Sequence, residues 1–310
     1  MNCRRDDSTA LFAVTGLTGF IGKRFQELAA ESFAIVPLTL SESPVPENPR
    51  EPTSEEKKAE RVLLHLAGAT GQPRDAGEEE TLRQSIVALA GRVAEELSRR
   101  KYSRLVFLSS AALEADHDSK LRRSGYARGK EEAEQVLTSA ARQRDIPIVV
   151  LRPTRVVGPG DRRRSLLPLM SWIARRRFVP FAKDSWANFV YVDDMAAALL
   201  RAGSGRLPGG VYAVNEPVLW PRFLEMIAAS LFVPLRGLGV SASLLRAVAR
   251  GLAASKASRL ELTAGRLEEL AGAAPIRCEP LLEAWPDFPE VGLRRGLPVL
   301  AASYRSSGLL

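Results

Sequence analysis

Three glycines near the start of the chain have the spacing of a phosphate-binding turn. Gly16, Gly19 and Gly22 could permit a tight bend, let the backbone approach a pyrophosphate, and allow a helix to pack closely on a sheet, in that order. An apolar run at residues 11–15 precedes them and helical spacing follows at residues 20–30, so the amides that open the helix can bind an anion. A tight turn without a ligand is the alternative. The motif in this context favours a bound dinucleotide.

A tyrosine and a lysine four residues apart form the second candidate. Tyr126 and Lys130 share one face of a predicted helix. A phenol has an ordinary pKa near 10 and is a poor base at neutral pH, but a nearby ammonium favours its phenolate. Tyr126 could then exchange the proton of an alcohol while hydride moves to or from a nicotinamide. Taken alone, such a pair is more often part of a solvated helix face.

Two serines, Ser109 and Ser110, end an apolar run at residues 105–108. Ligands bind at the carboxyl ends of strands in open α/β sheets. A hydroxyl at this end of a strand could orient a substrate oxygen toward Tyr126. Capping of the strand end without a ligand is the alternative.

Arginines gather in the second half of the chain. One triplet, residues 162–164, follows a Gly-Pro-Gly turn, and another occupies residues 175–177. Guanidinium groups suit bidentate binding of phosphate, so Arg162 and Arg163 are candidates to bind an anionic substrate. Solvated helix ends are the alternative, favoured for the second triplet. We expect no nucleic-acid partner, because aromatic residues do not interleave with these arginines and no nucleic-acid-binding motif is present.

The elements that must position these residues alternate along the first half of the chain. Five short runs are nearly continuous in apolar residues, at residues 11–15, 33–40, 62–66, 105–108 and 146–151. Strands buried on both faces have this character, which predicts a parallel sheet covered by helices. Amphipathic stretches lie between the runs. The pattern predicts an α/β fold with a doubly wound parallel sheet of Rossmann type over residues 9–160, to which residues 188–217 return.

The second half of the chain loses the strict alternation. We expect strands at residues 189–192 and 210–214 and helices at residues 221–232, 243–254 and 259–271. These features predict a smaller C-terminal substrate-binding domain made of residues 161–187 and 218–305. Residues 41–61 contain four prolines and many charges, so we expect a loop in place of a regular βα unit.

The composition narrows the classes of protein that fit. A chain of 310 residues, 45% hydrophobic and 26% charged, can bury a large core, which excludes disorder along its whole length. The net charge of +8 favours anionic ligands only weakly, because both signs are interspersed. Two cysteines and two histidines form neither a disulfide framework nor a metal site. No apolar run suits a membrane helix or a signal peptide, so we expect a cytoplasmic protein. Because the histidines and cysteines do not cluster, we expect no bound metal.

Six stretches together carry a resemblance to a known family. They are VTGLTGFIG (14–22), LLHLAGAT (63–70), RLVFLSS (104–110), YARGK (126–130), LRPTRVVGPG (151–160) and NFVYVDDMAAAL (188–199). In this order the chain resembles the extended short-chain dehydrogenase/reductase family, of the NAD(P)-dependent epimerase/dehydratase type. Several ordered motifs are more specific than any one of them.

The resemblance implies a set of functional residues and a cofactor, NAD or NADP. It implies a catalytic trio of Ser110, Tyr126 and Lys130, in which Lys130 also holds the nicotinamide ribose. The implied pyrophosphate turn consists of Gly16, Gly19, Phe20, Ile21 and Gly22. The other implied cofactor contacts are Ala67, Gly68, Ser109, Tyr126, Lys130 and Pro153. The resemblance also implies a homodimer through the helix at about residues 80–100 and the helix of Tyr126.

The chain departs from the family at several positions. Thr39, Leu40 and Ser41 stand where members carry an acidic residue or, for NADP, an Arg, so the choice between NAD and NADP stays open. Arg155 stands where nucleotide-sugar enzymes often carry Asn, and residues 187–188 are Ala-Asn where they often carry Arg-Asp. We therefore expect relocated arginines to bind the substrate. These are Arg155, Arg162 and Arg163.

These features predict an NAD(P)-dependent oxidoreductase or epimerase that acts on a carbohydrate, and specifically on a nucleotide sugar. The two candidate reactions are 4-keto-sugar reduction and 4-epimerisation. A dehydratase is disfavoured, because Ala111 follows Ser110 where dehydratases of the family usually carry Asp-Glu. The rival hypothesis is a non-catalytic dinucleotide-binding sensor or assembly subunit of the same fold. The intact trio of Ser110, Tyr126 and Lys130 argues against this rival. The departures from the family at residues 39–41, near the adenosine half of the cofactor, and at residues 187–188, near the substrate diphosphate, argue for it.

Overall fold

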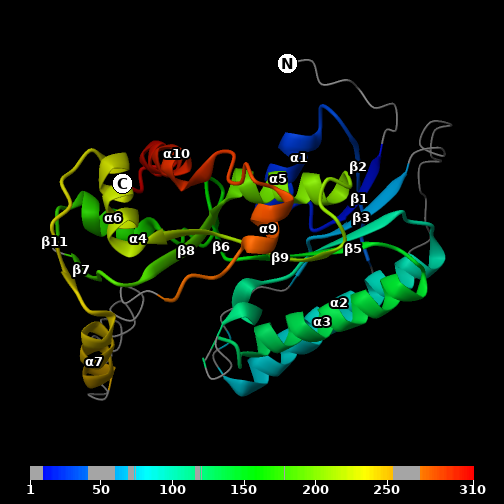
Figure 1. Cartoon of the computed structure of the whole chain (residues 1–310), viewed down its shortest axis with the longest axis horizontal. Helices are drawn as coiled ribbons and strands as arrows, with labels where there is room; N and C mark the ends of the chain where they lie inside the picture. The colour runs from blue at the N-terminus through cyan, green and yellow to red at the C-terminus, as the bar shows by residue number, and fades with distance from the viewer. Residues whose placement is uncertain are drawn as a thin grey trace. The chain divides into compact units, whose positions relative to one another are not determined.

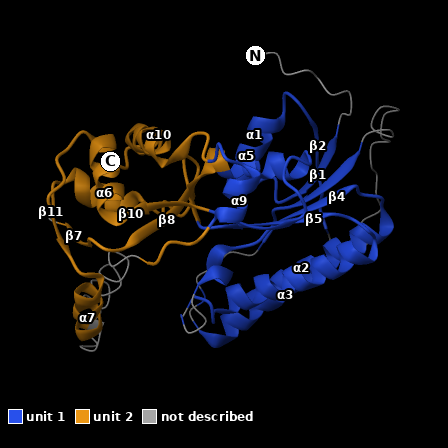
Figure 2. Cartoon of the chain, viewed as in Figure 1, with its two compact units in different colours: residues 1–154, 195–214, 278–288 blue, residues 155–194, 215–277, 289–310 orange. Residues whose placement is uncertain are grey.

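The computed structural model describes residues 10–40, 60–68, 73, 75–115, 119, 121–177, 179–253 and 273–310 (Figure 1). The chain divides into two compact units, which Figure 2 colours separately. Unit 1 comprises Met1–Thr154, Met195–Val214 and Cys278–Phe288, and unit 2 comprises Arg155–Asp194, Asn215–Arg277 and Pro289–Leu310. The predicted helix at residues 259–271 and most of the predicted loop at residues 41–61 lie outside the described residues.

Unit 1 is built on a sheet of six parallel strands. They are β1 (Leu11–Thr15), β2 (Ala34–Pro37), β3 (Arg61–His65), β4 (Arg104–Leu108), β5 (Ile148–Pro153) and β9 (Gly210–Val214). Their order is β2-β1-β3-β4-β5-β9, and all neighbours pair in parallel. The predicted α/β fold with a parallel sheet is confirmed. Because β2 and β3 flank β1 on opposite sides, the strand order reverses there and opens a crevice at the carboxyl ends of the strands.

Helices cover both faces of this sheet, which explains the apolar strands. α2 (Ala76–Arg99) and α3 (Gly125–Gln143) lie along one face, and α1 (Phe20–Ala29) and α5 (Val192–Gly203) lie on the other (Figure 1). A short 3-10 helix, η1 (Ala111–Glu114), follows β4, and α9 (Glu279–Ala284) lies beside β9. Side chains from α2 and α3 form one core with the inner strands. Its large members include Leu63, Val93, Leu97, Leu105, Phe107 and Leu137.

Two glycines let α2 and α3 approach each other closely. A Cβ atom added to Gly125 would lie 2.3 Å from the carbonyl oxygen of Glu79, and one added to Gly129 would lie 3.1 Å from the Cα of Arg83. A larger residue at Gly125 would therefore push the helices apart. This contact fixes the start of α3, which carries Tyr126 and Lys130, against α2.

Unit 2 combines two small sheets with helices. β6 (Arg155–Val157), β8 (Trp186–Tyr191) and β10 (Glu216–Leu219) form one sheet, and β7 (Val179–Ala182) pairs with β11 (Gly237–Val240). The helices are α4 (Leu167–Ala174), α6 (Trp220–Leu231), α7 (Ala242–Ala253) and α10 (Gly292–Ser306). The core holds a stack of aromatic rings, in which Phe223 lies between Phe189 (centroids 4.7 Å apart) and Trp220 (5.4 Å).

The division into units differs from the predicted domains in four segments, one of which, residues 215–217, belongs to unit 2 because β10 pairs with β8. Residues 155–160 and residues 188–194 belong to unit 2, because β6 and β8 pair with each other. Residues 278–288 belong to unit 1, where α9 contacts β9. None of the helices in the described part of the chain is long and apolar enough to cross a membrane.

Candidate active site

The glycine turn joins β1 to α1 with very little space around two of its glycines. Gly16 has a φ of +75°, and a Cβ atom on it would lie 2.5 Å from the amide nitrogen of Ala67. A Cβ atom on Gly22 would lie 2.3 Å from the carbonyl oxygen of Gly16. Both positions therefore require glycine. At Gly19 an added Cβ would have one neighbour within 4 Å, the Gly16 carbonyl oxygen at 3.1 Å, so a side chain there requires only a small shift of that carbonyl.

The start of α1 has the properties of an anion site. Gly19 is the N-cap residue and supplies no side-chain hydrogen bond, and the first turn contains no acidic residue. The amides that open the helix, including those of Phe20 and Ile21, thus have no capping side chain, and the helix dipole favours a negative charge there. A pyrophosphate fits this turn both sterically and electrostatically.

Lys130 lies buried beneath the carboxyl end of β4. Its Nζ atom donates a hydrogen bond to the carbonyl oxygen of Leu108 (2.8 Å) and lies 4.8 Å from the centroid of the Phe107 ring. Burial lowers the pKa of Lys130 to about 8, and the negative charge of Glu134 opposes that shift. A Cβ atom added to Gly68 would lie 3.3 Å from this Nζ atom. The predicted cofactor contact Gly68 therefore lies next to the predicted catalytic lysine.

The other two members of the predicted trio lie close by in unit 1. Tyr126 is half-buried in the first turn of α3, one turn before Lys130 on the same face. Ser110 follows the end of β4 and caps η1, where its hydroxyl accepts a hydrogen bond from the amide of Ala112 (3.2 Å). The topology thus brings Ser110, Tyr126 and Lys130 to the carboxyl edge of the sheet.

Ser109 takes part in a buried network of charged groups. Its hydroxyl donates to Glu134 Oε1 (2.5 Å), and Arg152 donates to both oxygens of Glu134, from Nε at 2.9 Å and from Nη2 at 2.5 Å. Arg152 also donates to Glu114 Oε1 at 2.7 Å. Glu134 and Arg152 are not among the site residues predicted from the sequence. The signal was the i, i+4 spacing of Glu134 from Lys130, which continues the face that Tyr126 begins.

His65 is a second buried polar residue that was not predicted to belong to the site. It is the last residue of β3, and its Nδ1 atom lies 2.7 Å from the hydroxyl of Thr15 at the end of β1. The same hydroxyl accepts a hydrogen bond from the amide of Ala67 (3.2 Å). Burial, followed by the charge of Lys130, lowers the pKa of His65 to about 3, so the imidazole is neutral. The predicted contact Ala67 is held in place by this chain of hydrogen bonds. The predicted contact Pro153 is buried at the end of β5.

The arginines predicted to bind the substrate belong to unit 2. Arg155 is exposed on β6, and its guanidinium carbon lies 5.6 Å from the centroid of the Phe189 ring. Arg162 and Arg163 are exposed in the turn after Gly160, where Asp161 accepts a hydrogen bond from the amide of Arg163 (2.9 Å).

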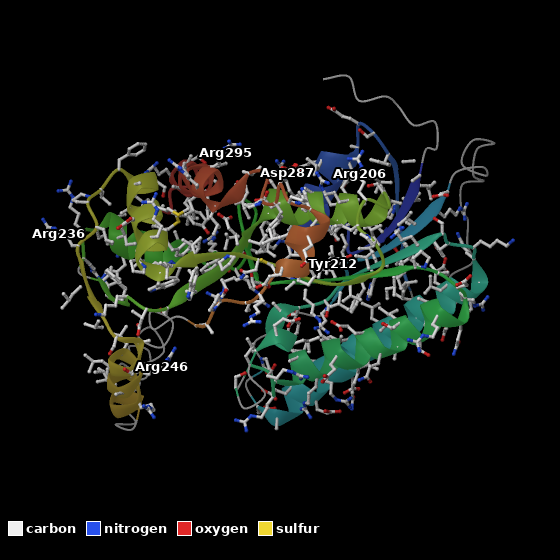
Figure 3. All side chains as sticks on the ribbon, viewed as in Figure 1. Arg206, Tyr212, Arg236, Arg246, Asp287 and Arg295 are labelled. Atoms are coloured by element: carbon white, nitrogen blue, oxygen red, sulfur yellow. The ribbon has the colours of Figure 1, made fainter. Side chains whose placement is uncertain are left out.

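The net positive charge of the chain resides in unit 2. Its sequence contains 19 Lys and Arg against 10 Asp and Glu, whereas unit 1 contains 25 against 26. Arg236, Arg246 and Arg295 are exposed examples (Figure 3). A basic unit attracts anionic ligands. Within the residues described, no group of three or more His, Cys, Asp or Glu could hold a metal ion.

The fold and this site define a dinucleotide-binding α/β protein, and the comparisons with known proteins specify its family. The model of the NAD dependent epimerase/dehydratase family matches residues 12–214. The chain belongs to this family, which confirms the predicted resemblance and the class of NAD-dependent enzyme. No curated protein sequence is similar enough to count as a match.

Solved structures similar to this chain share its fold. RMD from Pseudomonas aeruginosa, solved with NADPH, has a TM-score of 0.66 at 19% identity over 96% of this chain and 100% of that chain. WbmH from Bordetella bronchiseptica, solved with NAD⁺, has a TM-score of 0.65 at 15% identity over 97% and 99%. The UDP-glucose 4-epimerase from Thermotoga maritima, solved with UDP-glucose, has a TM-score of 0.64 at 15% identity over 96% and 99%. The NADPH and NAD⁺ in two of them agree with the predicted cofactor, NAD or NADP.

Proposed function

We propose that this protein is an NAD(P)-dependent reductase or 4-epimerase of a nucleotide sugar. The observation that carries the proposal is the arrangement at the carboxyl end of β4. There the buried Lys130 donates to the Leu108 carbonyl, on the helix face that also bears Tyr126, while Ser110 follows the strand end.

The residues of the glycine turn would hold the dinucleotide. The uncapped amides of Phe20 and Ile21 are suited to bind its pyrophosphate, and Gly16 and Gly22 leave room for the close approach that this requires. At the carboxyl edge of the sheet, Ala67 and Gly68 follow β3, Ser109 follows β4, and Pro153 ends β5. When bound, the nicotinamide would donate a hydride to the substrate carbon in its reduced form, or accept one from that carbon in its oxidised form.

The trio would move the proton that accompanies this chemistry. The Tyr126 phenol exchanges a proton with the reacting oxygen of the substrate, and the ammonium of Lys130 favours the phenolate that this requires. At pH 7 Lys130 remains mainly charged, because its pKa of about 8 lies above that pH. The Ser110 hydroxyl donates a hydrogen bond to the same substrate oxygen and orients it.

Two features support a nucleotide sugar as the substrate class. The excess of Lys and Arg in unit 2 favours an anionic substrate. Arg155, Arg162 and Arg163 are exposed guanidinium groups that could bind its phosphates. Reduction of a 4-keto sugar and 4-epimerisation both use the same proton exchange at the tyrosine.

The alternative is a non-catalytic sensor or assembly subunit that binds the dinucleotide only structurally. We favour the enzyme because a purely structural site has no need of a buried lysine beside a tyrosine. Incubation of the purified protein with NADH or NADPH and a panel of UDP- and dTDP-4-keto sugars distinguishes the two. Loss of absorbance at 340 nm with at least one sugar is expected of a reductase, and conversion of a UDP-hexose to its 4-epimer is expected of an epimerase. Dinucleotide binding without either reaction would favour the sensor.

We further propose that the protein is a homodimer. α2 and α3 form a helical pair on one face of the sheet, and a self-complementary surface on such a pair suits a two-fold interface. The core of unit 1 contains the side chains of Ile86, Val93 and Leu97 of α2. A partner would therefore contact smaller exposed residues of this helix, such as Ala88. Light scattering at micromolar concentration should give twice the mass of the chain, and a monomer would contradict the proposal.

A further inference from the structure

Glu134 joins three segments that carry the candidate site. Glu134 lies on α3, one turn after Lys130. Its carboxylate accepts a hydrogen bond from the hydroxyl of Ser109, which follows β4, and two hydrogen bonds from Arg152 of β5. Ser109 precedes Ser110, and Arg152 precedes Pro153. One carboxylate thus connects the segments that bear five of the residues predicted to bind or react: Ser109, Ser110, Tyr126, Lys130 and Pro153.

The two central members of the network are buried, so their geometry is constrained. Glu134 is 9% exposed and Ser109 3% exposed. The bidentate pairing with Arg152 satisfies both oxygens of Glu134 and leaves its side chain a single orientation. The backbone supports the same arrangement, because the amide of Ser109 donates to the carbonyl oxygen of Leu151 (2.7 Å).

The charge of Glu134 also acts on Lys130. The groups around Lys130 are the neutral His65, the Phe107 ring, the carbonyl oxygen of Leu108, and Tyr126 and Glu134 on its own helix. Of these, Glu134 supports the protonated form of Lys130 against the effect of burial. Without it, the ammonium that assists Tyr126 would lose its proton at a lower pH.

We propose that Glu134 is a positioning residue, which holds the Ser109–Ser110 strand end and keeps Lys130 charged, an inference that rests on the proposed function. It touches neither substrate nor cofactor in this role. It acts through Lys130 by its charge and through Ser109 by its hydrogen bond.

A merely structural role makes a different prediction for Lys130. If Glu134 only braced the sheet, its loss would loosen the site, admit water to Lys130 and raise the pKa of Lys130 toward its ordinary value of about 10.4. If its charge acts as proposed, the loss lowers that pKa. The direction of the change therefore separates the two roles.

The test measures the pKa of Lys130 directly, without any dinucleotide. The chain contains eight lysines, so protein labelled with ε-13C-lysine gives a simple NMR spectrum in which Lys130→Arg identifies the signal of Lys130. In Glu134→Gln, the titration midpoint of Lys130 should fall by roughly one pH unit, a tenfold change in proton affinity. Glu134→Asp, which keeps the charge, should restore most of the midpoint.

Two further variants complete the design. Glu114→Gln makes the same substitution in the other, more exposed partner of Arg152, and it should leave the midpoint unchanged. If Glu134→Gln does not fold because Arg152 is left unpaired, the double variant Glu134→Gln/Arg152→Gln removes both charges. Its midpoint should lie below that of Arg152→Gln alone, a comparison that separates the charge of Glu134 from that of Arg152.

An unchanged or raised midpoint of Lys130 in folded Glu134→Gln would overturn the inference. NADH binding by the wild-type protein is measured separately by fluorescence. If the wild type binds no NADH or NADPH, the proposed function fails, whereas the titration of Lys130 still decides whether Glu134 acts on it.

Discussion

The hydroxyl oxygen of Thr15 and the Nδ1 atom of His65 lie 2.7 Å apart, at the ends of the neighbouring strands β1 and β3. The same hydroxyl accepts a hydrogen bond from the amide of Ala67 (3.2 Å), so Thr15 links the end of β1 both to His65 and to the segment after β3. The His65 ring is neutral, because burial lowers its pKa to about 3. A polar pair thus closes the strand ends directly below the glycine turn.

The neutrality of His65 predicts acid sensitivity. Its pKa falls from 6.5 to about 3 on folding, so the unfolded chain binds a proton between these values and the folded chain does not. Stability contributed by the neutral ring is therefore present above pH 6.5 and is lost as the pH falls toward 3. Between pH 7 and pH 5 the loss should amount to about 2 kcal/mol. Urea denaturation of the wild type and of His65→Gln measures it, and an equal pH dependence in both would contradict the assignment.

A half-buried carboxylate in unit 2, that of Glu216, predicts the opposite dependence. Glu216 accepts a hydrogen bond from the amide of Leu293 (2.6 Å), and Asp194 accepts two from the amides of Val291 and Gly292 (2.8 Å each). Burial raises the pKa of Glu216 to about 7, and the charge of Asp194 adds to the shift. The two carboxylates together hold the start of α10.

Because the pKa of Glu216 is raised on folding, its contribution to stability is present below pH 4.5 and is lost as the pH rises through 7. Glu216→Gln keeps an acceptor for Leu293 and removes the charge. At pH 8 the variant should be about 1–2 kcal/mol more stable than the wild type, after allowance for its partial exposure. Thermal melting at pH 5 and pH 8 tests this, and a variant less stable than the wild type at pH 8 would refute it.

The order of elements was predictable because local patterns specify it. The apolar runs became strands β1, β3, β4, β5 and β9, and the resemblance rests on short motifs at their ends. β2 is shorter than the predicted residues 33–40. β2 lies at one edge of the described sheet, and four of its residues pair with β1.

The buried network and the division into units were not predictable in the same way. Ser109, Glu134 and Arg152 come from three elements, and only the packing of α3 on the sheet brings their charges together. Likewise, the residues of β8 (186–191) predict a buried strand. They do not predict that β6 and β10 are its partners. Long-range pairing depends on the whole fold, whereas a strand or helix depends mainly on its own residues.

Tyr126→Phe removes the exchangeable proton and keeps the ring, which packs against the unit 1 core. General acid–base catalysis contributes about two to four orders of magnitude, so kcat should fall by about 100-fold or more. Binding of the dinucleotide should change little. Steady-state kinetics and calorimetry check the two expectations, and a variant that keeps most of its activity would remove Tyr126 from its role.

Arg155→Ala tests the anionic substrate. A charge-assisted contact to phosphate contributes about 1.5–3 kcal/mol, so KM for a UDP-sugar should rise at least about tenfold. Affinity for the dinucleotide should stay the same, and substrate binding should weaken with added salt. Arg175→Ala, in the triplet attributed to solvated helix ends, is the matched control. An unchanged KM in Arg155→Ala would leave only the broader reductase class.

The central claim is that the glycine turn binds a dinucleotide, and Gly19→Val tests it most directly. A side chain at residue 19 meets little of the protein itself, so the variant should fold, yet it occupies the space in front of the uncapped amides of α1. Gly91→Val, whose added Cβ meets nothing within 4 Å, is the control. Calorimetric titration with NADH and NADPH should show binding to the wild type and the control, and a loss of at least about tenfold in Gly19→Val. Equal affinity in Gly19→Val, or no binding by the wild type, would contradict the account.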